Sequence, residues 1–342
     1  MNLFTKFQVK DMILRNRVVL PPMDMYCATE DGFPTDAHFV HYVSRALGGT
    51  GLIIMEATGV LPRGRISDNC LGLWSDKHIE PLRNIVAACQ ARGAKVAIQL
   101  NHAGRKCYAK AEPYIHAPSA IAFSDEYRCP RAIQQDEIAE VVDAFRTAAK
   151  RAYLAGFDAL EIHAAHGYLI SEFLSPITNK RTDAYGGSLE NRCRLLKEVL
   201  AAVRQEWPES KPLLMRVSAE DYLPEGIHPD EMAQIINLVR EYIDVVDVST
   251  GGVAIAPIKV YPGYQVRAAE TIKAQCALPV IAVGLIKDPE VAEEIISNGR
   301  ADLVGLGREQ FRNPNWVLNV ARDYGVSYDW PDSYKEAFEA RK

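Results

Sequence analysis

Eight short apolar runs recur along the chain, and each is followed by small or polar residues. The runs are Val18–Leu20, Leu52–Glu56, Val96–Leu100, Ala159–Ile162, Leu213–Val217, Val245–Val248, Val280–Val283 and Leu303–Leu306. Continuous apolar runs of this length are typical of strands buried on both faces, as in a parallel sheet covered by helices. The pattern therefore predicts eight buried strands.

Helical periodicity separates most of these runs. Apolar residues recur at a spacing of 3.6, and residues that favour helix ends flank them. The clearest predicted helices cover 138–152 with Gly156 after it, 188–203 with Ser188 at its start, and a segment that Asp288-Pro289 opens and Gly299 follows. Strands that alternate with helices in this way predict an α/β fold, a TIM (β/α)8 barrel.

The barrel is predicted to be a single domain over residues 1–342. A doubly wound sheet is the rival fold, but its dinucleotide fingerprint is missing because Gly305-Leu306-Gly307 has no third glycine three positions on. Within 1–16, Thr5–Leu14 predicts a hairpin that turns near Lys10-Asp11 and plugs the barrel floor. The long connection after the third strand is interpreted as a lid over 107–131, and 324–342 as a tail.

Composition narrows the functional classes. The 342 residues carry 39 basic and 44 acidic side chains, a formal net charge of −5, and no run of Lys and Arg that would favour nucleic acid. No apolar stretch is long enough to span a membrane, and the start lacks the apolar core of a signal peptide. Seven scattered cysteines without a C-x-x-C pair argue against a disulfide framework, so we expect a cytoplasmic protein.

Polar residues and glycines close the predicted strands, where barrel enzymes place their active sites. Arg216 lies inside an apolar run, and a buried guanidinium needs an anionic partner. Gly284 and Gly307-Arg308 follow the last two strands, where barrels hold phosphate groups with backbone N–H donors. These positions predict an anionic ligand that carries a phosphate.

Two histidines three positions apart, His163 and His166, end the fourth strand, and Tyr168 follows them. As hydrogen-bond donors they would hold a carbonyl oxygen while Tyr168 supplies a proton. As metal ligands they would need a third partner, for which His102 or Glu161 is the candidate. A purely structural histidine pair is the third interpretation.

Several ordered motifs resemble the Old Yellow Enzyme family of FMN-dependent ene reductases, in particular its bacterial thermophilic-like branch. The motifs are Asn16-Arg17, Pro22-Met23-x-Met25-Tyr26, Gln99-Leu100-x-His102-Ala103-Gly104-Arg105-Lys106, Ala117-Pro118-Ser119-Ala120, His163-Ala164-Ala165-His166-Gly167-Tyr168-Leu169, Arg181-Thr182-Asp183-x-Tyr185-Gly186-Gly187-Ser188-x-Glu190-Asn191-Arg192 and Gly305-x-Gly307-Arg308. The resemblance covers almost the whole chain.

The resemblance implies a non-covalent FMN, reduced by NADPH or NADH, that reduces an electron-poor alkene. The implied flavin contacts are Pro22, Met23, Ala57 and Gln99 at the ring, Arg216 at its N1/C2 edge, and Gly284, Gly307 and Arg308 at the phosphate. His163 and His166 would bind the carbonyl or nitro oxygen, Tyr168 would protonate the α-carbon, and Tyr26 and Lys106 would border the substrate. A homo-oligomer, either a dimer or a tetramer, is also implied.

Asp24 departs from the family pattern, which has Cys or Thr at this flavin-proximal position. An ionised carboxylate only accepts hydrogen bonds. At about 4 Å it would oppose flavin reduction by roughly 4 kcal/mol at an effective dielectric near 20. We therefore expect Asp24 to be protonated near the flavin or turned towards a cation such as Lys106, unless it only caps a turn.

Other functions stay open at this stage. One is an FMN-dependent demethylase or dehydrogenase of the same family with altered flavin tuning, and another is a flavin protein that has lost ene reduction. A third is a metal-dependent barrel lyase or hydrolase that uses His163, His166 and His102. In the resembled branch a terminal arginine enters the neighbouring active site, and Arg341 is the candidate here.

Overall fold

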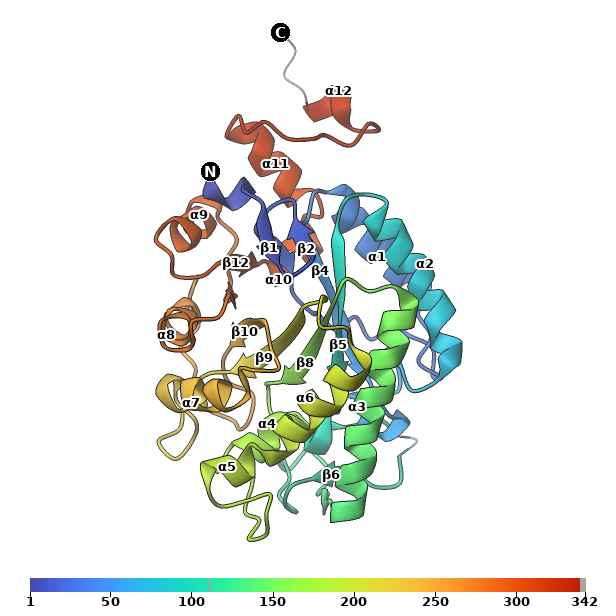
Figure 1. The fold of residues 1–342 in the computed structure, drawn as a ribbon, viewed down its shortest axis with the longest axis vertical. Coiled ribbons are helices and arrows are strands. Elements are labelled where there is room, and N and C mark those ends of the chain that lie inside the picture. The colour runs from blue at the N-terminus through green and yellow to red at the C-terminus, as the bar shows by residue number, and fades with distance from the viewer. Residues whose placement is uncertain (111, 339–342) are drawn as a thin grey trace.

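A closed barrel of eight parallel strands forms the centre of the computed structural model, which describes residues 1–110 and 112–338 (Figure 1). The strands are β3 (Val18–Leu20), β4 (Leu52–Gly59), β5 (Lys95–Asn101), β8 (Ala159–Ala164), β9 (Leu213–Ser218), β10 (Val245–Ser249), β11 (Val280–Ala282) and β12 (Leu303–Gly305). Each follows its neighbour in chain order, and β12 pairs with β3 to close the ring. All eight predicted strands and the TIM barrel are confirmed.

Helices surround the barrel because most of the longer ones bury an apolar stripe against it. The longer ones are α1 (Asp36–Leu47), α2 (Ile79–Gln90), α3 (Gln135–Ala155), α6 (Arg194–Glu206), α7 (Pro229–Val239), α8 (Val266–Cys276), α9 (Pro289–Ser297) and α11 (Trp316–Asp323). The short ones are α4 (Leu169–Leu174), α5 (Leu189–Arg192), α10 (Gly307–Arg312) and α12 (Lys335–Phe338). Single 3-10 turns cover Asn2–Phe4, Pro62–Gly64, Asp76–His78 and Gly104–Lys106.

The predicted helix over 188–203 is wrong in one respect, because it breaks at Cys193 into α5 and α6. Ser188 does cap the start, since its hydroxyl accepts a hydrogen bond from the Asn191 N–H. The apolar spacing continues across the break, so the pattern carries no sign of it. By contrast, α3 ends where predicted, at Gly156 with φ +88°.

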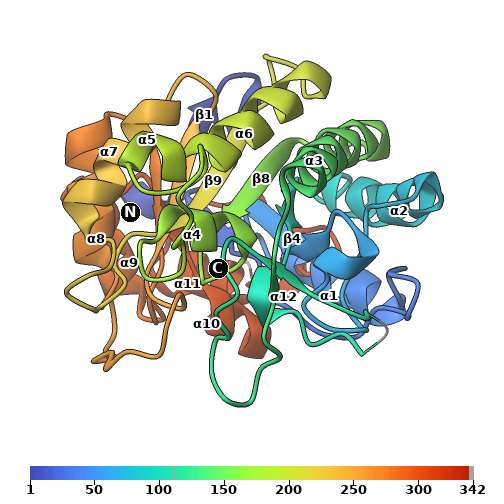
Figure 2. The same cartoon turned by 90° about the horizontal axis from the view of Figure 1, so that it is seen from below.

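An N-terminal hairpin closes the barrel floor, as predicted. Strands β1 (Phe7–Val9) and β2 (Met12–Leu14) pair antiparallel, and Lys10 in the turn has φ +48°. Val9, Met12 and Leu14 pack in one apolar cluster with residues at the starts of the barrel strands. This end of the molecule also carries α11 and α12 (Figures 1 and 2). They lie far from the opposite end, where the barrel strands finish, which we call the mouth of the barrel.

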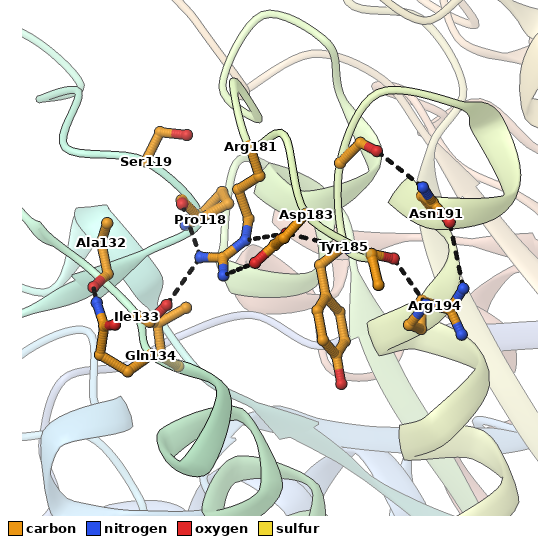
Figure 3. Close-up of polar contacts among 12 residues, drawn as sticks. Pro118, Ser119, Ala132, Ile133, Gln134, Arg181, Asp183, Tyr185, Asn191 and Arg194 are labelled. Carbon is orange, nitrogen blue, oxygen red and sulfur yellow. Dashed lines mark hydrogen bonds and ion pairs between the residues drawn. The ribbon is translucent and has the colours of Figure 1, made fainter.

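The connection between β5 and α3 folds back on itself. Its two short strands, β6 (His116–Ala117) and β7 (Arg131–Ala132), pair in parallel. Arg181 anchors them: its guanidinium donates to the carbonyls of Pro118 at 3.2 Å and Ile133 at 2.7 Å, and it pairs with Asp183 (Figure 3). The Arg181-x-Asp183 motif is therefore a structural lock on this connection, whose role as a lid stays a prediction.

None of the helices in the described part of the chain has both the length and the apolar character needed to cross a bilayer.

Candidate active site

A cavity of about 430 Å³ opens where the barrel strands end. Six residues singled out from the sequence line it together: Met23, His166, Arg216, Gly284, Gly307 and Arg308. They come from five different strands or the loops after them, which the closed barrel brings to one place. Residues at the ends of different strands therefore line one cavity.

Other lining residues were missed from the sequence, among them Gln265, Lys287 and Arg312. Lys287 comes five residues after β11, so an extension of the strand-end rule would have found it. Gln265 lies at the start of α8, sixteen residues past the end of β10, and carries no local signal. Arg312 ends α10, and its place in the cavity depends on how that helix packs.

The glycine end of the cavity fits a phosphate. A Cβ on Gly307 would lie 2.9 Å from the Met23 sulfur, and Gly284 has φ +117° with the Gln265 backbone nitrogen 3.0 Å from its Cβ position. The positive φ and the nearby backbone favour glycine at Gly284, whereas at Gly307 a side chain would displace the flexible Met23. Backbone N–H groups can approach a ligand closely at such positions. Arg308 and Lys287 add positive charge beside them. This donor set fits the phosphate of the expected FMN.

Arg216 is nearly buried, with 7% of its surface exposed, and lines the cavity from β9. It donates to the Pro22 carbonyl at 3.2 Å, and its Nε lies 3.2 Å from Asp247 Oδ2. Gln99 and Ala57 are buried on neighbouring strands, and the Gln99 amide donates to Glu161 at 2.9 Å. A fixed guanidinium at the cavity wall suits the electron-rich edge of a reduced flavin.

The two histidines lie together, with ring centroids 5.2 Å apart and planes at 90°. His163 Nδ1 accepts from the Ala165 N–H at 3.3 Å, so its proton is assigned to Nε2. His166, at φ +61°, has Nε2 2.8 Å from the Ser249 hydroxyl. Burial is the main cause that lowers the pKa of each imidazole well below 6.5, and the positive charge of Arg216 adds to it.

Tyr168 stands beside this pair, its ring centroid 4.9 Å from that of His163. Burial raises the pKa of its phenol well above 10, so the proton is retained at neutral pH. Tyr26 is 45% exposed near the same region, with φ +53°. Lys106 Nζ donates to the carbonyls of His166 at 2.9 Å and Gly252 at 3.0 Å.

Asp24 is enclosed next to Met23, and its Oδ1 is buried without a hydrogen-bond partner in the described structure. Burial, reinforced by the negative charge of Glu56, raises the pKa of Asp24 to about 7. Glu56 accepts from the Tyr42 hydroxyl at 3.0 Å and the Met25 N–H at 3.1 Å. Lys106 is engaged with backbone carbonyls, so the protonated form is the better supported of the two expectations for Asp24.

The metal-dependent alternative finds no ligand set within residues 1–110 and 112–338, because no three His, Cys, Asp or Glu side chains there are grouped to hold an ion. His102 is buried, and its Nδ1 accepts from the Gly104 N–H at 3.2 Å. The tail candidate Arg341 lies outside the described residues.

The chain is similar to flavin oxidoreductases and NADPH dehydrogenases over almost its whole length. Residues 2–325 match the family described as NADH:flavin oxidoreductase / NADH oxidase. An NADPH dehydrogenase of Clostridium acetobutylicum is 56% identical over 340 residues, which cover 99% of this chain and 100% of that protein. One from Bacillus subtilis is 47% identical over 338 residues, covering 98% and 99%.

Solved structures of related enzymes share the fold. Morphinone reductase superposes with a TM-score of 0.81 and 29% identity, over 97% of this chain and 91% of that one. A 2-naphthoyl-CoA reductase complex gives a TM-score of 0.88 and 28% identity, over 95% of this chain and 52% of that one.

Proposed function

Because the chain belongs to the NADH:flavin oxidoreductase / NADH oxidase family, to which the Old Yellow Enzymes belong, we propose that it reduces the C=C bond of α,β-unsaturated carbonyl or nitro compounds. It is an NAD(P)H-dependent FMN oxidoreductase.

One observation carries the proposal: two neutral imidazoles and a protonated phenol meet beside the cavity that Arg216 lines. His163 Nε2 and His166 Nδ1 have no hydrogen-bond partner among the described residues. With the Ser249 hydroxyl donating to His166 Nε2, the proton of that ring is on Nδ1, and both N–H groups are proposed to bind one substrate oxygen. Donors of this kind stabilise negative charge that develops on a carbonyl or nitro oxygen.

Each residue then has a role that its surroundings support. His163 and His166 bind the substrate oxygen, which draws electron density from the β-carbon of the alkene. Tyr168 donates a proton to the α-carbon, for which its retained phenolic proton is suited. Arg216 and the glycine end with Arg308 hold the cofactor. Bound FMN supplies the transfer of hydride from NAD(P)H to the alkene.

Anaerobic stopped-flow on the purified yellow holoenzyme tests this function. NADPH should bleach the flavin absorbance, and cyclohexenone or maleimide should restore it. A His163→Ala, His166→Ala double variant should still be bleached by NADPH but recover far more slowly with either alkene. Enzyme that NADPH reduces and no activated alkene reoxidises would contradict ene reduction and favour a flavin protein that has lost this activity.

A further inference from the structure

A charged layer crosses the barrel interior beneath the cavity. Gln99 on β5 is in register with Glu161 on β8, and Arg216 on β9 is in register with Asp247 on β10. Glu161 and Asp247 are fully buried. Arg216 has a role in the proposed function, and Gln99 is an implied flavin contact, but the two acids have no role so far.

The partners within the layer do not satisfy both acids. Gln99 donates to Glu161 Oε1 at 2.9 Å, while Arg216 Nε lies 3.2 Å from Asp247 Oδ2 without hydrogen-bond geometry. Within the described residues, Glu161 Oε2 and both Asp247 oxygens have no hydrogen-bond partner. Two buried carboxyl groups therefore share a single guanidinium.

A second buried negative charge with no cation of its own is costly, and such a carboxyl group normally keeps its proton instead. Burial raises the pKa of both acids, the charge of Asp247 adds to the rise for Glu161, and Arg216 opposes the rise for each. Two more groups interact electrostatically with Arg216: Asp24, in the loop after β3, and His163, on β8. His163 is neutral, so it brings no charge of its own.

We propose that Glu161 and Asp247 keep one proton between them at neutral pH, so that the pair offers one negative charge to balance Arg216. Protons distributed in this way belong to the pair rather than to either residue. Arg216 also lines the cavity, so the pair sets how much positive charge reaches a bound flavin. This last consequence rests on the proposed placement of FMN.

A proton shared by Glu161 and Asp247 predicts that replacing either acid changes the charge of the other. In Asp247→Asn, Glu161 becomes the sole acid beside Arg216 and should ionise. In Glu161→Gln, Asp247 should ionise for the same reason. Either single variant therefore keeps Arg216 balanced, and only the double variant leaves its charge uncompensated.

Infrared difference spectra of the oxidised holoenzyme at pH 7 test the sharing directly. The C=O band of one protonated carboxylic acid should disappear in each single variant, and the double variant should lose no more than either. Retention of that band in one single variant, additive loss in the double variant, or no loss at all would each overturn the shared proton. Asp247→Leu with Glu161→Met is a second double variant if the amide pair does not fold.

Glu172→Gln is the matched control, because burial also raises the pKa of Glu172, to about 8, but its contact is with the Arg105 backbone rather than Arg216. It should remove only its own band, and combining it with Asp247→Asn should give additive losses. Non-additivity in this combination would overturn the assignment of sharing to the Glu161–Asp247 pair.

The midpoint potential of bound FMN separates the two parts of the inference. The single variants should stay near the wild-type value. In the double variant, the preference for reduced over oxidised FMN should increase at least tenfold compared with wild type. This corresponds to a rise in midpoint potential of about 30 mV for a two-electron couple. The expected infrared pattern with an unchanged potential would support the shared proton and overturn the placement of the flavin beside Arg216.

Discussion

Neutral histidines suit a carbonyl-binding site because each ring already carries an N–H donor. No proton has to be taken up before the ring can stabilise the negative charge that develops. Burial holds the pKa of His163 and His166 well below 6.5, so neither ring changes charge near neutral pH. Substrate binding by this pair should therefore vary little with pH from neutrality upward. The phenol of Tyr168 is the opposite kind of group, a weak acid made weaker by burial.

Replacing the phenol isolates the protonation step. Tyr168→Phe removes the proton donor and leaves the ring in contact with His163. General acid catalysis contributes about 10²- to 10⁴-fold, so the rate of flavin reoxidation by cyclohexenone should fall by that order. Stopped-flow traces of flavin reduction by NADPH should change far less. An equal loss in both half-reactions would indicate a structural role for the tyrosine.

Asp24 should make the stability of the protein depend on pH. Its pKa is about 7 in the folded protein against an ordinary 3.8, so folding binds the proton more tightly than the unfolded chain does. The stability that the protonated Asp24 contributes is fully present below pH 3.8 and is lost as the pH rises to about 7. Asp24→Asn should therefore gain stability relative to wild type over that range, by at most about 4 kcal/mol.

Urea unfolding of both proteins at pH 5, 6, 7 and 8 measures this gain. Asp125→Asn, an exposed carboxyl group in the long connection, serves as the control and should track wild type at every pH. A gap between Asp24→Asn and wild type that stays constant with pH would mean that Asp24 is ionised throughout. The midpoint potential should also fall more steeply with pH in wild type, because ionised Asp24 opposes flavin reduction.

At the scale of elements, two loops at the mouth are joined into one unit. A Cβ on Gly252 would lie 2.7 Å from the His166 Cα, and Lys106 donates to the carbonyls of both residues. Ser218 accepts from the His166 N–H and donates to the Gly251 carbonyl. The left-handed backbone of His166 is thus held from several sides.

Lys106 is expected to position the His166 turn as well as border the substrate. Lys106→Met leaves two carbonyls without their donor and should cost about 1–3 kcal/mol in folding free energy. It should also raise KM for the alkene. Thermal unfolding and steady-state kinetics measure both effects, with exposed Lys110→Met as the control. A raised KM with unchanged stability would mean that Lys106 only touches substrate.

Elements differed in how well the sequence revealed them. Barrel strands are buried on both faces, so each appears as a continuous apolar run and all eight could be predicted. The strands β6 and β7 have two residues each and are fixed by Arg181, a contact from a distant part of the chain. Gln265 was missed for the same physical reason, because its place in the cavity depends on tertiary packing.

At the scale of the whole molecule, we expect the floor to contribute to folding stability and the mouth to bind the cofactor. The hairpin buries Leu14 in the barrel floor, while Ile13 in the same strand is 49% exposed. Leu14→Ala should cost about 2–5 kcal/mol of unfolding free energy, because it leaves a cavity in the floor. Ile13→Ala should cost much less. Denaturant unfolding measures both, and the FMN content of the folded Leu14→Ala protein should stay at the wild-type level.

Loss of FMN from folded Leu14→Ala protein would show that the floor also controls the mouth. The sequence indicated which residues meet at the strand ends, because barrel topology alone places them together. It could not indicate that carboxyl oxygens of Glu161 and Asp247 are buried without a hydrogen-bond partner, because this depends on which side chains meet inside the closed ring.

The position of the amino terminus has a practical consequence for biocatalysis. Met1 lies at the floor end with α11, and the mouth opens at the other end of the barrel (Figure 1). A solid support or a cofactor-recycling enzyme tethered at Met1 would therefore leave the mouth facing the reaction medium. Immobilised preparations made in this orientation should keep the turnover of the free enzyme.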